Sequence, residues 1–403
     1  MKKVFFDHIS TTPLHPDVLD ALLPFFVGQY GNPSSHIHEQ GQLALRAIEG
    51  AREKVAGLIH ATPEEVVFTS GATESNNLAV KGVAGAMKKK GMHIIVSEVE
   101  HFSVLNALIP LINEGYEITY LPVDRHGLID PEELRQSVRD DTILISVMHA
   151  NSEIGTIMPV LEVGAVAREK DVYFHCDATA SAGHIPVDVE RMGADLLTLS
   201  AHNFYGPKGA GALFVRKGTR IAPLQEGGFQ EGGLRAGTEN VTGIVGFGKA
   251  AEIAMDEMEE DALRLRDLEQ QLREGLKNRI SHIHFTGHEV SRLPGHVSFW
   301  IEFAEGESLL IYLNINGVMA ASGSACSSNL KAQDEEDLVA SHVLKAIGVP
   351  SDICTGSITF SMGKWNRPDE VDYVLEIMPG IVQRLWEISP SYSDYLKSGG
   401  VRR

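Results

Sequence analysis

The stretch Ser200-Ala-His-Asn-Phe-Tyr-Gly-Pro-Lys-Gly209 joins two short apolar runs, Leu196–Leu199 and Ala212–Val215. These runs have few polar side chains, as expected of strands in a mostly parallel sheet that helices cover on both faces. Similar runs occur at Val66–Thr69, His93–Ser97, Ile118–Leu121, Thr142–Val147 and Val172–Cys176. Because helical stretches alternate with them, the sequence predicts an α/β fold whose large domain holds a mostly parallel sheet of about seven strands.

The rest of the chain predicts a smaller α+β domain. Residues 43–59 have the apolar spacing of an amphipathic helix, and a helix over roughly 246–279 connects the two domains. Strands at His296–Ile301 and Ser357–Phe360 and helices from Glu307 and from about Pro368 complete the smaller domain. We therefore divide the chain into an N-terminal segment 1–15 that packs with the small domain, a large domain 16–245 and a small domain 246–403. We expect 321–341 and the tail after Ser389 to be mobile.

Composition excludes several classes of partner. The 403-residue chain carries a formal charge of −19, which disfavours binding to nucleic acid or to an anionic membrane. It contains no apolar run long enough to span a bilayer. Its three cysteines, Cys176, Cys326 and Cys354, are too scattered for a disulfide framework or a zinc site, so we expect a reducing, cytoplasmic setting.

Polar and glycine-rich segments follow several of the predicted strands, where open α/β sheets bind ligands. Ser70-Gly-Ala-Thr-Glu-Ser-Asn76 begins a helix and is suited to bind an anion, although a capped turn explains it equally well. His101 could stack on a planar ring or be an ordinary strand-end residue. Asp177 could pair with a protonated pyridine nitrogen or cap a turn, and Asn151 occupies a similar strand-end position.

The segment Ala321-Ser-Gly-Ser-Ala-Cys-Ser-Ser328 places Cys326 among small residues. A thiol in such a loop is more often a nucleophile or a ligand than a packing residue. Cys176, within an apolar strand, is expected in the core.

Together these segments resemble the NifS/IscS-type cysteine desulfurases of the aminotransferase class V group, which are fold-type I enzymes of pyridoxal 5′-phosphate (PLP). The resemblance covers nearly the whole chain. It includes Phe6-Asp-His-Ile-Ser-Thr-Thr12, Gly31-Asn-Pro-Ser-Ser35, Gly227-Gly-Phe-Gln-Glu-Gly-Gly-Leu-Arg-Ala-Gly-Thr-Glu-Asn240, Glu305-Gly-Glu-Ser-Leu-Leu310 and Arg384-Leu-Trp-Glu-Ile-Ser-Pro390. It implies a homodimer that binds PLP in the large domain, acts on L-cysteine and docks an IscU-type iron–sulfur scaffold protein through its C-terminal region.

The resemblance also implies roles for individual residues. His101 would stack on the cofactor ring and take part in catalysis, Asp177 would pair with the ring nitrogen, and Asn151 would lie near the phenolic oxygen. Cys326 would attack the substrate sulfur and carry it as a persulfide. The phosphate would be held by Ala72, Thr73, Ser200, His202 and, across a dimer interface, Thr238.

Three positions depart from the family pattern. Asn203 stands where the family has the lysine that forms a Schiff base with PLP, and a carboxamide cannot form one. Ala180 replaces a glutamine near the ring oxygen, and Thr359 replaces the arginine that binds the substrate carboxylate. We do not expect Lys208, which lies beyond Gly206-Pro207, to substitute for the missing lysine.

These departures leave alternative functions open. The first is a cysteine desulfurase family protein of iron–sulfur cluster assembly that delivers sulfur through a Cys326 persulfide, with PLP-dependent turnover impaired. The second is a catalytically defective assembly partner whose Cys326 accepts sulfur from another source or ligates a scaffold-bound [2Fe-2S] cluster. A third, an aminotransferase or other PLP lyase, would leave Cys326 without a role.

Overall fold

The computed structural model describes residues 2–322, 341–350 and 357–398. Its main sheet has seven strands in the order β2-β8-β7-β6-β5-β3-β4. In chain order they are β2 (Val66–Thr69), β3 (His93–Ser97), β4 (Glu117–Leu121), β5 (Thr142–Ser146), β6 (Tyr173–Asp177), β7 (Leu196–Ser200) and β8 (Gly211–Val215). Only β8 runs antiparallel to its neighbours, β2 and β7. The predicted α/β fold with a mostly parallel seven-stranded sheet is confirmed.

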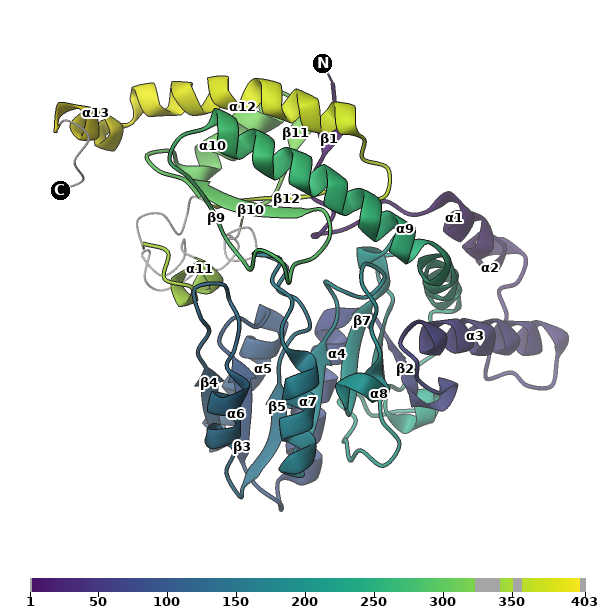
Figure 1. The fold of residues 1–403 in the computed structure, drawn as a ribbon. Coiled ribbons are helices and arrows are strands. Elements are labelled where there is room, and N and C mark those ends of the chain that lie inside the picture. The colour runs from purple at the N-terminus through teal and green to yellow at the C-terminus, as the bar shows by residue number, and fades with distance from the viewer. Residues whose placement is uncertain (1, 323–340, 351–356, 399–403) are drawn as a thin grey trace.

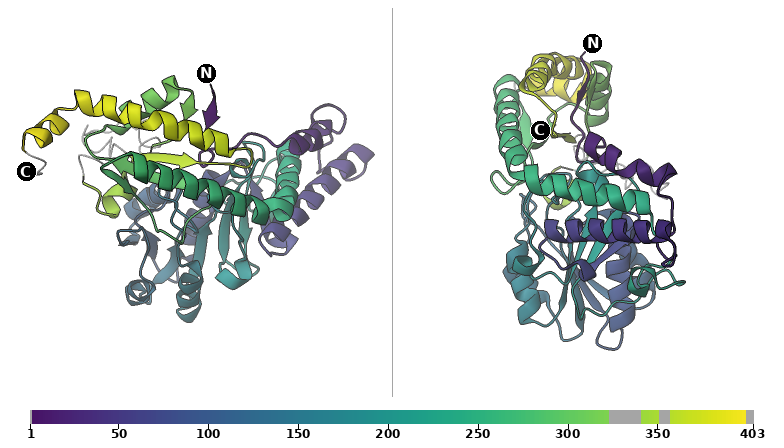
Figure 2. Two further views of the ribbon diagram at one scale, coloured as in Figure 1. Left: turned by 45° about the horizontal axis from the view of Figure 1, so that its top comes forward. Right: turned by 90° about the vertical axis from the view of Figure 1, so that its right-hand side faces the viewer.

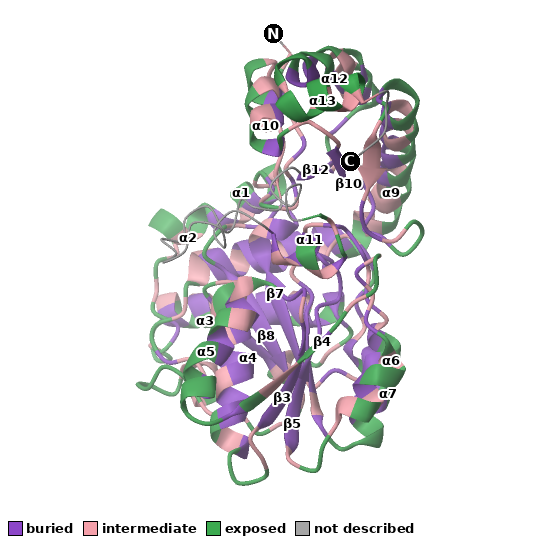
Figure 3. Ribbon diagram, turned by 90° about the vertical axis from the view of Figure 1, so that its left-hand side faces the viewer, coloured by how far each residue is buried: buried purple, intermediate pink, exposed green. Residues whose placement is uncertain are grey.

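Helices cover both faces of this sheet (Figures 1 and 3). On one face, α4 (Ala72–Met87) and α5 (Phe102–Asn113) bury Leu78 and Leu108 in a shared apolar core. The other face is covered by α3 (Glu39–Leu58), α6 (Pro131–Ser137), α7 (Val160–Glu169), α8 (Val189–Met192) and the first part of α9 (Val241–Arg279). This double cover explains why the strands are apolar on both faces.

The smaller unit is built on a three-stranded antiparallel sheet in the order β12-β10-β9. Its strands are β9 (Ile283–Phe285), β10 (His296–Ile301) and β12 (Ser357–Ser361). The second half of α9, α10 (Gly306–Ile315) and α12 (Pro368–Ile388) pack in the same core, and α11 (His342–Ala346) lies nearer the large sheet (Figure 1).

The N-terminus joins this smaller unit. Strand β1 (Val4–Phe5) pairs in parallel with β11 (Val318–Met319), and Val4 and Phe6 are fully buried in the small core. The chain then crosses to the large unit through α1 (Pro16–Leu22) and α2 (Pro24–Val27), which lie beside α9 (Figure 2). The division of the chain at residues 15 and 245 stays a prediction.

The expectation of a mobile tail after Ser389 is wrong, because α13 spans Pro390–Lys397. The Ser389 side chain caps this helix by accepting a hydrogen bond from the Tyr392 N–H group. Tyr392 stacks on Trp386 at 5.0 Å, and the Tyr395 ring lies 5.0 Å from that of Phe303. These aromatic contacts hold a segment whose polar composition favours mobility. Most of the other stretch expected to be mobile, 323–340, lies outside the described residues.

Two glycines at the contact between α3 and α9 give a test of the packing. A Cβ atom on Gly248 would lie 2.6 Å from the Cα atom of Ala51, whereas one on Gly50 would meet no atom within 4 Å. We expect Gly248→Ala to lower the free energy of unfolding by about 1–3 kcal/mol, and Gly50→Ala to raise it by about 0.5–1 kcal/mol. Urea unfolding of both variants checks this, and changes of the same sign would contradict the packing described.

Candidate functional site

A hydrogen-bond network joins Asp177 to His101 at the carboxyl ends of β6 and β3. Asp177 accepts hydrogen bonds from the Asn76 side chain at 2.7 Å and from the Thr179 N–H group at 2.9 Å. The Asn76 amide also donates to Ser103 Oγ at 2.8 Å, and Ser103 Oγ lies 2.7 Å from His101 Nδ1. Two residues that the sequence singles out for separate roles therefore share one connected network.

The network fixes the orientation of the His101 ring. Its Nδ1 atom accepts the Ser103 N–H group at 3.1 Å, so the neutral imidazole carries its proton on Nε2. The His101 side chain is exposed, whereas Asp177 is only 5% exposed. No ion pair among the described residues includes Asp177, so a protonated ring nitrogen bound there would supply the missing countercharge.

The start of α4 is a candidate anion site beside this network. Gly71, with φ at 151°, precedes Ala72 and Thr73, and no side chain caps the helix. The first N–H groups of a helix lack intrahelical acceptors and favour negative charge. The buried Ser200 Oγ atom, at the end of β7, has no hydrogen-bond partner among the described residues. These groups fit the phosphate end of PLP.

Asn203 and His202 are held by the N-terminal segment. The Asn203 side chain donates to the Ile9 carbonyl at 3.2 Å, and its Oδ1 atom is buried without a partner among the described residues. His202 Nδ1 lies 3.2 Å from Thr11 Oγ1. Asn203 thus presents a neutral amide at this point of the site. The residues present fit the phosphate and the ring nitrogen of PLP, but position 203 offers no amine for covalent attachment.

The Asn151 side chain stabilises a turn. Its Oδ1 atom accepts the N–H groups of Glu153 and Ile154 at 2.9 and 3.0 Å, and its amide donates to the Val99 carbonyl at 3.0 Å. Its placement near the phenolic oxygen of a cofactor stays a prediction. Ala180 is 7% exposed and packs in a small apolar cluster with Ala150, so its side chain offers no polar contact.

Thr359 lies on β12 and faces the same turn. Its hydroxyl donates to the Glu153 carbonyl at 3.0 Å, and its N–H group pairs with the Ala321 carbonyl at 2.9 Å. A threonine hydroxyl cannot form the two parallel, charge-assisted hydrogen bonds with which arginine binds a carboxylate. This part of the site therefore lacks a side chain that could bind a substrate carboxylate strongly.

Thr238 is exposed and lines a cavity of about 200 Å³ together with Ser70 and Gly209. The loop that carries it is fixed by Glu231, whose carboxylate receives two hydrogen bonds from Arg52 and one from the Phe68 N–H group. The anion site and the Thr238 loop thus lie side by side in one chain.

The sequence predicts no role for two carboxyl groups that are buried near the site. One oxygen of Glu100, which is fully buried, accepts the Met148 N–H group at 2.7 Å, and the other has no partner among the described residues. Burial raises the pKa of the Glu100 carboxyl well above its usual range. The adjacency of Glu100 to His101 was the only signal in the sequence.

The second carboxyl, Glu153, predicts a pH dependence of stability. Burial, partly offset by a hydrogen bond with Ser341, raises its pKa from 4.5 to about 7. Between these values the folded chain binds more protons than the unfolded one, so stability falls as pH rises through this window. The loss is at most about 3 kcal/mol. We expect Glu153→Gln to remove this part of the fall, measured by urea unfolding at about pH 5 and pH 8.

The control for this experiment is Glu133→Gln, because Glu133 is exposed on α6. That variant should keep the wild-type difference in stability between the two pH values. If Glu153→Gln also kept the full difference, the carboxyl would not titrate in the range given.

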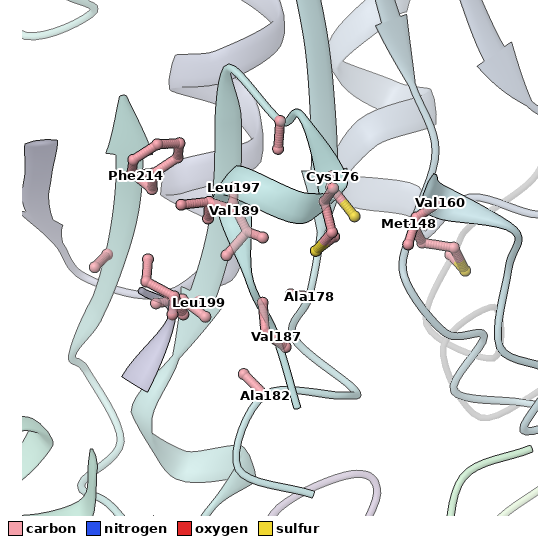
Figure 4. Packing of buried hydrophobic residues seen from close by; sticks show 14 of the residues in the cluster. Met148, Val160, Cys176, Ala178, Ala182, Val187, Val189, Leu197, Leu199 and Phe214 are labelled. Atoms are coloured by element: carbon pink, nitrogen blue, oxygen red, sulfur yellow. The ribbon is translucent and has the colours of Figure 1, made fainter. Parts of the chain in front are cut away.

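The cysteines divide by location. Cys176 is fully buried, and Figure 4 shows it among apolar side chains such as Val189 and Leu197, as expected of a core residue. Burial raises the pKa of its thiol well above the usual range, which makes it a poor nucleophile. Cys326 and Cys354 lie outside the described residues. Within those residues, no group of His, Cys, Asp and Glu side chains could hold a metal ion, and no helix is long and apolar enough to cross a membrane.

The fold is that of PLP-dependent transferases of fold type I, and the start of α4 and the buried Asp177 fit the cofactor of that class. The family model described as aminotransferase class-V matches residues 4–374, and the chain belongs to that family. The resemblance to NifS/IscS-type cysteine desulfurases is also confirmed. The cysteine desulfurase IscS of Dictyoglomus turgidum is 49% identical over 389 residues, covering 96% of this chain and 97% of that protein.

Other relatives agree with this assignment. The cysteine desulfurase IscS of Methanosarcina thermophila is 50% identical over 389 residues, covering 96% of this chain and 94% of that protein. Among solved structures, a NifS-like protein superposes with a TM-score of 0.88 at 38% identity and covers 95% of this chain and 100% of its own. The structure called SspA in complex with cysteine has a TM-score of 0.77 at 34% identity, covering 91% of this chain and 100% of its own.

Proposed function

We propose that this protein is a sulfur carrier of iron–sulfur cluster assembly, built on the cysteine desulfurase fold, whose own turnover of free L-cysteine is strongly impaired. The proposal depends mainly on the side chain of Asn203. It donates a hydrogen bond to the Ile9 carbonyl and has no amine to offer a cofactor. When PLP is bound, it withdraws electrons from the substrate carbon and so weakens the bond to sulfur.

The residues toward PLP then act by binding and orientation. The start of α4 and Ser200 hold the phosphate, Asp177 balances a protonated ring nitrogen, and His101 presents Nε2–H at the open side of the site. Without the lysine the cofactor has no covalent anchor, and without an arginine at position 359 a substrate carboxylate loses a contact of roughly 1.5–3 kcal/mol. Both losses impair the release of sulfur from free cysteine, and neither affects the transfer of sulfur from Cys326.

The transfer step balances without turnover of cysteine. The Cys326 thiolate attacks the terminal sulfur of a donor persulfide, the S–S bond of the donor breaks, and the donor leaves as a thiolate. Cys326 then carries the sulfur as a persulfide to an IscU-type scaffold protein. A thiolate in this position is also suited to ligate a scaffold-bound [2Fe-2S] cluster, which is the alternative role of the same residue.

A homodimer is part of this proposal and is supported by an exposed apolar surface. Side chains near α1, α2 and the Thr238 loop are strongly exposed, among them Phe229 at 94% and Ile37 at 86%. Large apolar side chains that are exposed in one copy of the chain favour burial in an interface. A second copy of the chain would bury these side chains, and the exposed Thr238 would then reach a phosphate in the partner. We also place the protein in the cytoplasm.

The experiment supplies sulfur in two forms and follows Cys326 by peptide mass. With free L-cysteine and PLP, we expect almost no alanine and no persulfide. With a persulfide donor, we expect the Cys326 peptide to gain the mass of one sulfur atom, and Cys326→Ala to abolish transfer to the scaffold. Brisk alanine release by the wild-type protein would contradict the proposal. Loss of a scaffold-bound cluster in Cys326→Ala, with donor sulfur never found on Cys326, would favour cluster ligation instead.

A further inference from the structure

A groove with a positively charged wall lies on the small unit, away from the cofactor site. It has a volume of about 920 Å³ and runs between the second half of α9, strand β9 and the segment around Arg125. In Figure 1, α9 crosses above the large sheet with β9 and β10 directly beneath it. Arg266, Arg273 and Lys277 of α9 line one side, and Arg125 of the large unit lines the other.

The charges in this groove are not balanced by one another. The buried Arg292 pairs with Glu269 at 3.0 Å and also donates to the His296 carbonyl, so both members are satisfied. The four remaining cations form no ion pair with any carboxylate of the described residues, although Arg266 and Arg273 also act on Glu269, and two further carboxylates, Glu274 and Glu289, line the groove. In a chain with a formal charge of −19, such a surplus of cations is unusual.

The cations form a line. Arg266, Arg273 and Lys277 follow one another at intervals of seven and four residues on one face of α9, with the neutral Gln270 between the first two, over a distance of roughly 16 Å. Apolar surface lies beside them, because Arg273 covers the Phe285 ring at 5.0 Å and Val290 is 83% exposed. A small anion needs donors that converge on one point. A helix with acidic and apolar faces matches a line of charge flanked by apolar side chains.

We propose that this groove docks an acidic amphipathic helix of a partner protein. Carboxylates spaced like the α9 cations would face Arg266, Arg273 and Lys277, and an apolar side chain would cover the exposed Val290. The groove is lined by 15 residues, fewer than the roughly 20–30 that a stable interface uses on each side. The complex is therefore transient and sensitive to salt. Neither Asn203 nor Cys326 is needed for docking at this groove.

The test uses a fluorescent 16-residue helical peptide with three glutamates spaced by seven and four residues, to match Arg266, Arg273 and Lys277, and with leucines beside them. Its control replaces each glutamate by glutamine. The protein variant is Arg266→Glu with Arg273→Glu. The matched variant is Lys89→Glu with Arg384→Glu, which changes the net charge equally at exposed positions outside the groove. Circular dichroism verifies that both variants are folded.

We expect the acidic peptide to bind with a Kd that rises about tenfold or more in the groove variant and less than about twofold in the matched variant. The glutamine peptide should not bind. Equal weakening in both variants would show attraction to net charge alone and overturn the proposal. So would absence of binding to the wild-type protein. Displacement of the peptide by one equivalent of inorganic triphosphate would make the groove a small-anion site and would also overturn it.

Discussion

Replacing Asn203 by lysine is expected to raise the rate of alanine release from L-cysteine by about 10²-fold or more. The lysine amine would attach PLP covalently and move protons at the substrate, which an amide bound to the Ile9 carbonyl cannot do. The ring-nitrogen and phosphate ends of the site already fit PLP, so this single change supplies the missing amine for covalent attachment. The measurement is alanine release in the presence of PLP, together with borohydride reduction to locate the cofactor on residue 203.

The control for this gain is Asn203→Gln, which lengthens the side chain but keeps the amide and should leave the rate unchanged. Adding Thr359→Arg to Asn203→Lys should lower the KM for cysteine, because the arginine can bind the substrate carboxylate in place of the hydroxyl that now contacts the Glu153 carbonyl. If Asn203→Lys acquired covalent PLP without any gain in rate, the impairment would lie elsewhere in the site.

Replacing Glu231 by alanine is expected to lower the free energy of unfolding by about 3–5 kcal/mol. The Arg52 and Glu231 side chains are only 10% and 2% exposed and form a two-bond ion pair whose N–O distance is 2.7 Å. Removing the carboxylate leaves the guanidinium without its buried countercharge and the Phe68 N–H group without its acceptor. The loop with Thr238 would be released as well, so we expect weaker dimerisation and weaker retention of PLP.

A neighbouring carboxylate supplies the control. Glu49 contacts the same guanidinium at 3.3 Å, but its side chain is 51% exposed, so Glu49→Ala should cost less than about 1 kcal/mol. Urea unfolding measures both variants, and sedimentation measures the dimer. Equal costs for the two variants would contradict the buried ion pair as the main anchor of the loop.

The strands were predictable because each is a short apolar run between polar turns. The predicted limits of β2, β3 and β10 agree with the structure residue for residue, since burial on both faces leaves few polar positions in them. Helix α13 could not be predicted in the same way. Its order depends on the contacts of Tyr392 with Trp386 and of Tyr395 with Phe303, which arise only when the β10–α10 turn and α12 meet.

The candidate site was also predictable only in part from the sequence. Motifs next to strand ends identify His101 and Asp177 one at a time, because each follows a recognisable apolar run. The bridge between them is Asn76, which is 101 residues from Asp177 in the chain, so its place in the network required the fold. Glu153 is another example, since its carboxyl meets Ser341, 188 residues later in the chain, only when α11 packs on the core of the large sheet.

The most direct test of the central claim is to locate the cofactor on the wild-type protein. Purified protein is saturated with PLP, reduced with borohydride and mapped by peptide mass, and a parallel sample is dialysed without reduction. We predict that no peptide carries a reduced cofactor and that dialysis removes PLP completely. A cofactor fixed on Lys208, or on any other lysine at the site, would show that the amine has been replaced and would contradict this prediction.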